Sequence, residues 1–292
     1  MGGTEYRRAT LSGPGGDFTL TEREVIGDRM ESVLTNVKGW YGGVGVDAEK
    51  TQRSLGHGLF PSVTRRTGRS ITVEGTLIFR EDADRLIADR FVSGLLWNGE
   101  PGTLTVETGQ YTLSTTVKID GEIGHAYRGT KAVDVQIPLI ATDPFLYAPT
   151  ETVQVYPEGA GVGLRFPLFG DPDHPGVLSF GKANPNTRAV IQNMGNATEY
   201  PVIRVCGDLP SGFTLRDSSG RTITYPAPVW SQSPVEVDSK LGAVFQGGQD
   251  QTYRATRRDW FSIEAGGVNS FTITAPQDGD GYAEIQHRST YI

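Results

Sequence analysis

Alternating apolar and polar residues predict several strands in the first half of the chain. This period of two is typical of a strand with one buried face. Three stretches show it, and their alternating positions are Ile71, Val73, Leu77 and Phe79, then Tyr111, Leu113, Thr115, Val117 and Ile119, then Val133, Val135, Ile137 and Leu139. We therefore predict three half-buried strands in this half.

A period of 3.6 replaces the alternation between the first two of these strands and predicts a helix over residues 82–97. Its apolar face consists of Ala83, Leu86, Ile87, Phe91, Val92, Leu95 and Leu96. Asp82 and Asp84 lie near the start, where the helix dipole favours carboxylates. Asn98-Gly99 supplies a left-handed stop. One helix among strands predicts a β-sandwich or barrel-like domain with the helix packed on one face.

Residues 40–69 follow neither period. They contain six glycines and, with His57, six basic residues. A structureless loop of this length is uncommon in a compact domain. Two interpretations stay open: an extended hairpin that serves as an arm between subunits, or a surface loop. For an arm, the candidate subunit contacts are Trp40, Tyr41, Arg53, Arg65, Arg66 and Arg69.

The second half shows many short strands and no helix of useful length. Strands at a spacing of 8–12 residues, separated by turn residues, predict a β-sandwich or jelly roll. The predicted strands are Arg188–Gln192, Tyr200–Cys206, Phe213–Arg216, Thr222–Tyr225, Val235–Asp238, Ala243–Gln246, Gln251–Ala255, Trp260–Glu264, Ser270–Thr274 and Tyr282–His287.

Length and composition agree with two turn-rich β domains. The chain has 292 residues, and its 38 glycines and 17 prolines favour short elements joined by turns. Asp143-Pro144 and Ala148-Pro149 bracket a junction, because proline disfavours helix in the residue before it. We predict a first domain over residues 1–143 and a second over residues 144–292.

Charge and the inventory of reactive residues argue against several functions. The 27 basic and 34 acidic residues give a net charge of −7, which disfavours non-specific nucleic-acid binding but suits a channel that DNA passes without being held. Cys206 is the single cysteine, so an internal disulfide is excluded. The four histidines lack metal-ligand spacing. We predict neither enzymatic activity nor a metal or cofactor. With no signal peptide or membrane-length apolar run, we expect synthesis in a cytoplasm.

Two aromatic residues leave a carbohydrate site open. Tyr225 and Trp230 flank a proline-containing segment between two predicted strands. Aromatic rings in loops can stack on the apolar C–H faces of sugars. The alternative is that Trp230 closes the edge of the sandwich, as buried or half-buried aromatics commonly do. A carbohydrate-binding module that helps attachment to a host surface is therefore the second functional hypothesis.

Three segments together resemble a known family. They are Thr142–Tyr147, Asn193–Gly207 and Asp259–Ile273, which contain an Asp-Pro-Phe junction, an Asn-x-Gly…Pro-x-Ile…Gly block and a Trp…Gly-x-Asn block. In this order they resemble the distal tail proteins of bacteriophages with long non-contractile tails, often labelled minor tail proteins. The run Ala265–Asn269 carries one residue more than the family's spacing between glycine and asparagine.

The resemblance implies a structural role at the tail tip of the virion. Family members form hexameric rings, in which the first domain continues the tube wall around the DNA channel and a galectin-like second domain points outward. The implied neighbours are the tail tube protein on one side and the baseplate hub or tail-associated lysin on the other. The tape measure and receptor-binding proteins are further candidate partners. In some members the outer domain binds host glycans.

Overall fold

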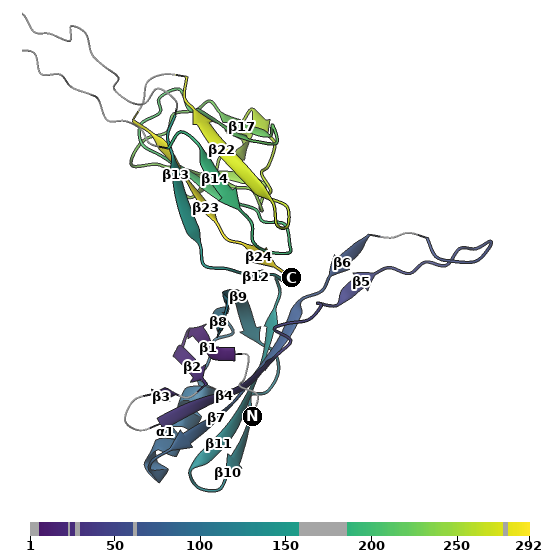
Figure 1. Cartoon of the computed structure of the whole chain (residues 1–292), viewed down its shortest axis with the longest axis vertical. Coiled ribbons are helices and arrows are strands. Elements are labelled where there is room, and N and C mark those ends of the chain that lie inside the picture. The colour runs from purple at the N-terminus through teal and green to yellow at the C-terminus, as the bar shows by residue number, and fades with distance from the viewer. Residues whose placement is uncertain (1–5, 23, 27–29, 61–62, 158–185, 277–279) are drawn as a thin grey trace, which may run out of the picture. The chain divides into compact units, whose positions relative to one another are not determined.

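The structure is a computed structural model that describes residues 6–22, 24–26, 30–60, 63–157, 186–276 and 280–292 (Figure 1). The chain divides into two compact units. The first comprises Met1–Pro149 and Tyr291–Ile292, and the second comprises Thr150–Thr290. The predicted mainly β class is confirmed, because strands dominate both units and the described residues contain a single α-helix.

The first unit is built around a closed barrel. Its elements are β1 (Tyr6–Gly13), β2 (Gly16–Thr21), β3 (Glu24–Ile26), β4 (Met30–Lys38), β5 (Val46–Ala48), β6 (Thr64–Arg66), β7 (Arg69–Phe79), α1 (Asp82–Ser93), β8 (Gly102–Thr108), β9 (Thr112–Ile119), β10 (Gly124–Arg128), β11 (Ala132–Ala141), β12 (Leu146–Tyr147) and β24 (Thr290–Tyr291). The barrel strands follow the order β11, β7, β4, β2, β1, β8 and β9, and β9 pairs again with β11. This closure removes the exposed edges that an open sheet would present.

The predicted alternation appears directly in the barrel strands. In β7 the residues Ile71, Val73, Leu77 and Phe79 are buried on one face. Gly75 continues this row where β7 crosses close to its neighbour, since a side chain there would collide with the Val33 carbonyl. Period two in the sequence therefore corresponds to the inner face of a pleated strand.

The helix is shorter than predicted, and part of its apolar face is exposed. α1 ends at Ser93 and is capped by Gly94, whose N–H bonds the carbonyls of the preceding turn. The chain then turns, so that Leu95 and Leu96 enter the core from a loop rather than from a helix. Leu86 and Ile87 are each 55% exposed, contrary to the prediction.

The second unit is a β-sandwich of two antiparallel sheets. Its elements are β13 (Glu151–Val155), β14 (Ala189–Gln192), β15 (Val202–Cys206), β16 (Phe213–Asp217), β17 (Thr222–Tyr225), β18 (Val235–Asp238), β19 (Ala243–Gln246), β20 (Gln249–Asp250), the 3₁₀-helix η1 (Thr252–Arg254), β21 (Arg257–Arg258), β22 (Val268–Thr274) and β23 (Tyr282–His287). One sheet has the order β13-β23-β15-β18-β19-β20 and the other β14-β22-β16-β17-β21. Their inner faces share one apolar core.

Two strands predicted in this unit do not form. Residues 251–255 contain η1, which starts where the Asp250 carboxylate accepts the Thr252 N–H at 2.8 Å, a local bond that competes with strand pairing. Residues 260–264 make only an isolated bridge between Ile263 and Glu199. Phe261 and Ile263 are nonetheless buried. The alternation of apolar and polar residues here therefore reflects burial, although no strand forms.

Candidate functional site

Residues 45–60 and 63–67 form an arm that leads away from the barrel (Figure 1). At its base, β5 and β6 pair antiparallel, with Val46 opposite Arg66. Farther out, Gln52 and Leu59 form an antiparallel bridge. The arm is therefore an extended hairpin, which is one of the two forms expected from the sequence.

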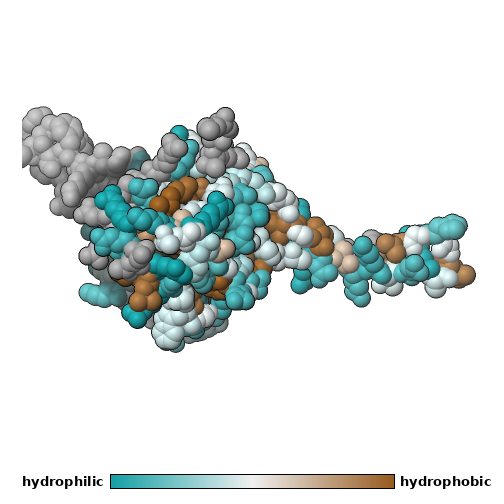
Figure 2. All heavy atoms as spheres, turned by 90° about the horizontal axis from the view of Figure 1, so that it is seen from below, coloured by the Kyte–Doolittle hydropathy of each residue, from teal (hydrophilic) through white to brown (hydrophobic). Residues whose placement is uncertain are grey.

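The arm presents apolar side chains to solvent. No described residue of the arm is buried, and Figure 2 shows apolar residues scattered among hydrophilic ones along it. Its exposed large apolar residues are Val46, Leu55, Leu59, Phe60 and Val63, with Leu55 93% and Val63 79% accessible. A concentration of exposed apolar groups on a thin projection is typical of a protein interface. The sequence pattern does not reveal these residues, because they follow no period and stand among glycines and polar residues.

The arm is basic although the chain is acidic. No Asp or Glu occurs from Lys50 to Val73. The arm carries four Lys or Arg and two Asp or Glu residues, so the remaining residues have a net charge of −9 against −7 for the whole chain. Near the tip the Arg53 guanidinium lies 5.9 Å from the centre of the Phe60 ring. The tip therefore combines apolar surface with positive charge.

The root of the arm is fixed in the barrel. Arg69 is buried and donates from Nε to the Pro144 carbonyl at 2.9 Å and from Nη1 to the Trp40 carbonyl at 2.8 Å. Burial lowers the pKa of Arg69. Trp40 is itself buried in the barrel core. Pro144 belongs to the Asp-Pro-Phe junction, which therefore helps to hold the arm's root.

The predicted arm contacts divide into two groups. Tyr41, Arg53, Arg65 and Arg66 are exposed, and for them the subunit contact stays a prediction. Trp40 and Arg69 are buried within the chain, which corrects their placement on the arm's surface. A tryptophan and an arginine beside glycines look alike in sequence whether they anchor a hairpin or project from it.

The two residues predicted to bind carbohydrate also differ in their exposure. Tyr225 is fully buried, its ring stacks on Phe213, and its hydroxyl lies 2.9 Å from Gln246 Oε1. It cannot stack on a sugar, because stacking requires at least one face of the ring to be reachable from solvent. Trp230 is 46% exposed and lies in a turn closed by the Ser233 N–H on the Trp230 carbonyl.

A shallow groove of about 540 Å³ lies on the six-stranded sheet, next to this turn. Arg204, Glu236 and Phe245 line it and are cross-strand neighbours on β15, β18 and β19. Pro234, which also lines it, directly follows the turn that holds Trp230. The groove thus offers a cation, a carboxylate and a half-buried ring in one row.

Asn193, the first residue of the Asn-x-Gly block, is a buried hydrogen-bond centre. Its Nδ2 donates to the carbonyls of Ala197 at 2.7 Å and of Ile263 and Glu264 at 3.2 Å. Its Oδ1 accepts from the N–H groups of Gly195 at 2.9 Å and Thr290 at 3.3 Å. The side chain therefore ties together segments that are distant in sequence.

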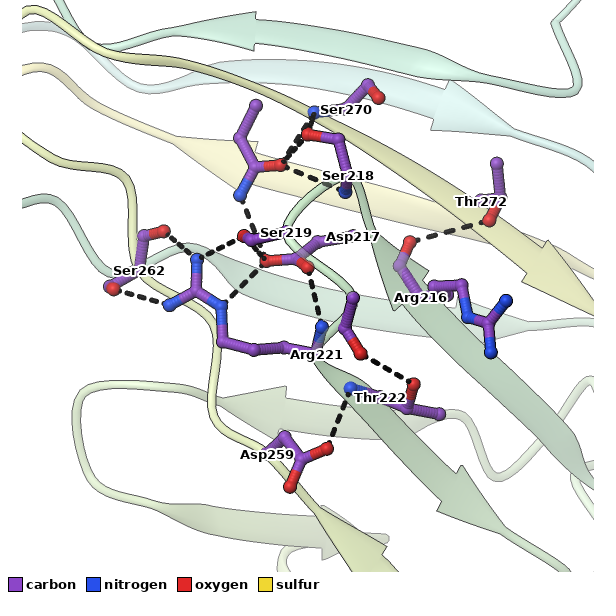
Figure 3. Close-up of polar contacts among 12 residues, drawn as sticks. Arg216, Asp217, Ser218, Ser219, Arg221, Thr222, Asp259, Ser262, Ser270 and Thr272 are labelled. Carbon is purple, nitrogen blue, oxygen red and sulfur yellow. Dashed lines mark hydrogen bonds and ion pairs between the residues drawn. The ribbon is translucent and has the colours of Figure 1, made fainter.

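Asn269, from the Gly-x-Asn block, belongs to a second polar network (Figure 3). It donates to Asp217 Oδ2 at 3.0 Å, and its Oδ1 accepts from the Ser218 hydroxyl at 2.6 Å. Arg221 Nε donates to the same Asp217 oxygen at 2.8 Å, and its Nη1 donates to the Ser262 hydroxyl at 2.5 Å. Both blocks therefore supply polar groups that hold turns of the sandwich in place.

Asp217 makes the stability of the second unit depend on pH. Burial acts to raise the pKa of this carboxyl, but hydrogen bonds from Asn269 and Ser219 and the charge of Arg221 outweigh it and lower the pKa below the ordinary value. A lowered folded-state pKa contributes stability above the unfolded value of about 3.9, which is lost as pH falls through the folded value.

We expect Asp217→Asn to be less stable than the parent at neutral pH, with a difference that narrows as pH falls below about 4. Denaturant unfolding of both proteins between neutral and acidic pH measures this difference. A difference in stability that stays constant across this pH range contradicts a lowered pKa for Asp217.

The described part of the chain holds no group of three or more His, Cys, Asp or Glu side chains arranged to bind a metal. In the same part of the chain, no helix has the length and apolar content to cross a membrane.

The fold resembles that of known phage proteins. No protein-family model and no curated protein matches the chain. The crystal structure of the Dit protein of phage SPP1, described as a paradigm of the hub adsorption apparatus in phages that infect Gram-positive bacteria, matches with a TM-score of 0.64 at 13% identity. The match covers 97% of this chain and 99% of the Dit chain.

Two further structures are of the phage P2 baseplate in its activated conformation. The structure with Ca gives a TM-score of 0.48 at 10% identity, and the structure with Sr gives 0.47 at 12%. Each covers 96% of this chain and 97% of the matched chain. At 13% identity the Dit match establishes a common fold, and at that level it confirms the predicted resemblance to phage distal tail proteins.

Proposed function

We propose that this chain is a structural, ring-forming adaptor of a phage tail tip. The observation that carries the proposal is the structural match to the Dit protein, which covers 97% of this chain and 99% of the Dit chain. The three sequence blocks and the exposed arm support the same conclusion. The role is one of assembly rather than catalysis.

In this proposal six copies form a ring around the DNA channel. The first unit meets the tail tube protein, and the opposite side meets the baseplate hub or tail-associated lysin. Tape measure and receptor-binding proteins are further neighbours. The chain is made in the host cytoplasm and acts in the virion. Its net charge of −7 suits a conduit, because like charge discourages DNA from adhering.

The ring is tested by the mass of the assembled protein. We expect a complex of about six times 31.6 kDa in native mass spectrometry and a closed ring in electron microscopy. Only monomers, across the concentrations at which tail proteins assemble, would count against the adaptor.

A second candidate function is carbohydrate binding by the second unit. The observation that favours it is the groove lined by Arg204, Glu236 and Phe245, together with the exposed ring of Trp230 nearby. Carboxylate and guanidinium groups can hydrogen-bond sugar hydroxyls, and aromatic rings can cover the apolar sugar face.

Glycan arrays test this second function. We expect binding that is lost in Trp230→Ala and in Glu236→Gln and is kept in Tyr200→Ala, which removes another exposed aromatic of the same unit. An array without any bound glycan, or equal binding by all variants, contradicts a site at this groove.

A further inference from the structure

A small apolar groove opens on the first unit between α1 and the neighbouring strands. Its volume is about 210 Å³. Leu77 on β7, Ala88 and Val92 on α1, and Val133 and Val135 on β11 line it, together with Ile123 from the loop before β10. A cavity of about 150 Å³ is large enough for a benzene ring. The groove therefore has room for one aromatic side chain.

The groove carries negative charge at its rim. Asp89 on α1 and Glu122, two residues before β10, both line it. Asp89 Oδ2 accepts the Tyr127 hydroxyl at 2.6 Å, which fixes that carboxylate at the edge. Glu122 is exposed. The nearby cation, Arg85, lies over the Tyr127 ring at 3.5 Å.

Exposed apolar surface continues from the groove along the helix. Leu86 is 55% exposed and lies three residues before Asp89 and seven before Ser93, both of which line the groove. Residues at these spacings share one face of a helix. The surface thus consists of an aromatic-sized hollow, an apolar ridge and two carboxylates.

The arm tip has the complementary chemistry. Phe60 is exposed, and Arg53 lies over its ring, so an apolar knob and a guanidinium occur as a pair. Lys50 adds a further positive charge, and no acidic residue follows until after Val73. Opposite charges around an apolar centre favour one partner and one orientation.

The arm leads away from the groove of its own chain (Figure 1). The arm joins the barrel at the start of β7, whereas Leu77 lies near the end of that strand. At about 3.3 Å per residue, the two points are roughly 26 Å apart, and Figure 1 shows the arm leading away from α1 and β10. The arm of a second copy can fill the groove. Such head-to-tail contacts close into a ring when the rotation between copies permits.

We propose that the groove between α1 and β10 receives the arm tip of a second copy of this chain. Phe60 of one copy fills the hollow, and Arg53 meets Asp89 and Glu122 of the next. This inference rests on the proposed ring and adds the surface that each arm recognises. Phe60→Ala is expected to raise the protein concentration needed for assembly by about tenfold or more, because buried aromatic anchors dominate interfaces.

Cross-linking between copies tests the docking site directly. In a Cys206→Ser chain, His57→Cys on the arm is combined with Ser93→Cys at the groove, and the protein is oxidised. We expect disulfide-linked multimers on a non-reducing gel. The matched control combines His57→Cys with Thr103→Cys, an exposed position on β8, and is expected to yield few multimers.

The outcomes separate the docking site from the proposed function. If the parent forms rings but the two cysteine pairs cross-link equally or not at all, the groove is not the docking site. The proposed adaptor function is then unaffected. Groove-specific multimers without closed rings support the docking site and contradict the ring. Neither rings nor multimers contradicts both.

A charge exchange provides a second measurement that does not depend on cysteine chemistry. Arg53→Glu and Glu122→Arg are each expected to weaken assembly. The double variant is expected to recover part of it, because the pair of residues 53 and 122 is restored with reversed signs while Asp89 stays unchanged. Both are exposed residues, so the folded state is expected to remain. Failure of the double variant to recover contradicts direct pairing of these residues.

Discussion

Replacing residues 47–65 by Asn-Gly will abolish ring assembly and leave both units folded. Val46 and Arg66 are direct partners in the β5–β6 ladder, so a two-residue turn can join them. None of the described side chains of the arm is buried, so its removal takes none of the described core residues from either unit. Because the arm carries the exposed apolar and basic groups, we expect monomers in native mass spectrometry and an unchanged thermal midpoint.

The control keeps the arm and changes one exposed hydroxyl residue on it, Thr64→Ser, and is expected to assemble like the parent. Rings of parental mass without the arm would show that other surfaces join the copies. A large drop in the thermal midpoint would show instead that the arm stabilises the barrel, although its described side chains are not buried.

The strands of the barrel could be predicted because burial there follows the backbone period. Ile71, Val73 and Leu77 lie on the inner face of β7 in the alternation read from the sequence. The helix end was less accessible to prediction. Leu95 and Leu96 continue the helical spacing, yet they reach the core after Gly94 has ended α1, because packing requires apolar groups and not a helical backbone.

The arm shows what composition can and cannot predict. An aperiodic, glycine-rich segment of this length predicted either a hairpin arm or a surface loop. Which residues anchor it depends on contacts with Pro144, which is distant in sequence from Arg69. The same limit applies to Tyr225, whose burial is decided by Phe213 and by the opposite sheet.

The Asn-x-Gly pattern of the second sequence block is typical of a turn, but the energetic role of the block is hidden in the sequence. Asn193 and Gly195 do form a turn, with the Gly195 N–H donating to Asn193 Oδ1. A side chain at Gly195 would collide with the Thr290 carbonyl, which explains why glycine is needed there. The partners that Asn193 finds at Ile263 and Thr290 belong to the third block and the chain's end, and no local pattern reveals them.

Asn193→Ala will destabilise the second unit by roughly 3–5 kcal/mol, a large share of the stability of a typical domain. The side chain is fully buried, and its removal leaves the carbonyls of Ala197 and Ile263 and the N–H of Thr290 without that partner. Buried groups that lose a hydrogen bond keep the full cost of their lost hydration. Hydrogen–deuterium exchange of the full chain measures the loss in the second unit, with the barrel as an internal reference.

Gln192→Ala is the matched control, because it removes an exposed amide from the adjacent position and is expected to change stability by less than about 0.5 kcal/mol. Asn193→Asp separates hydrogen bonding from packing, since it keeps the volume but replaces the Nδ2 donor with a carboxylate facing carbonyl oxygens. It should be as destabilising as alanine near neutral pH and partly recover in acid, where the protonated carboxyl can donate. A loss below about 1 kcal/mol for Asn193→Ala would mean that water or backbone rearrangement replaces these bonds.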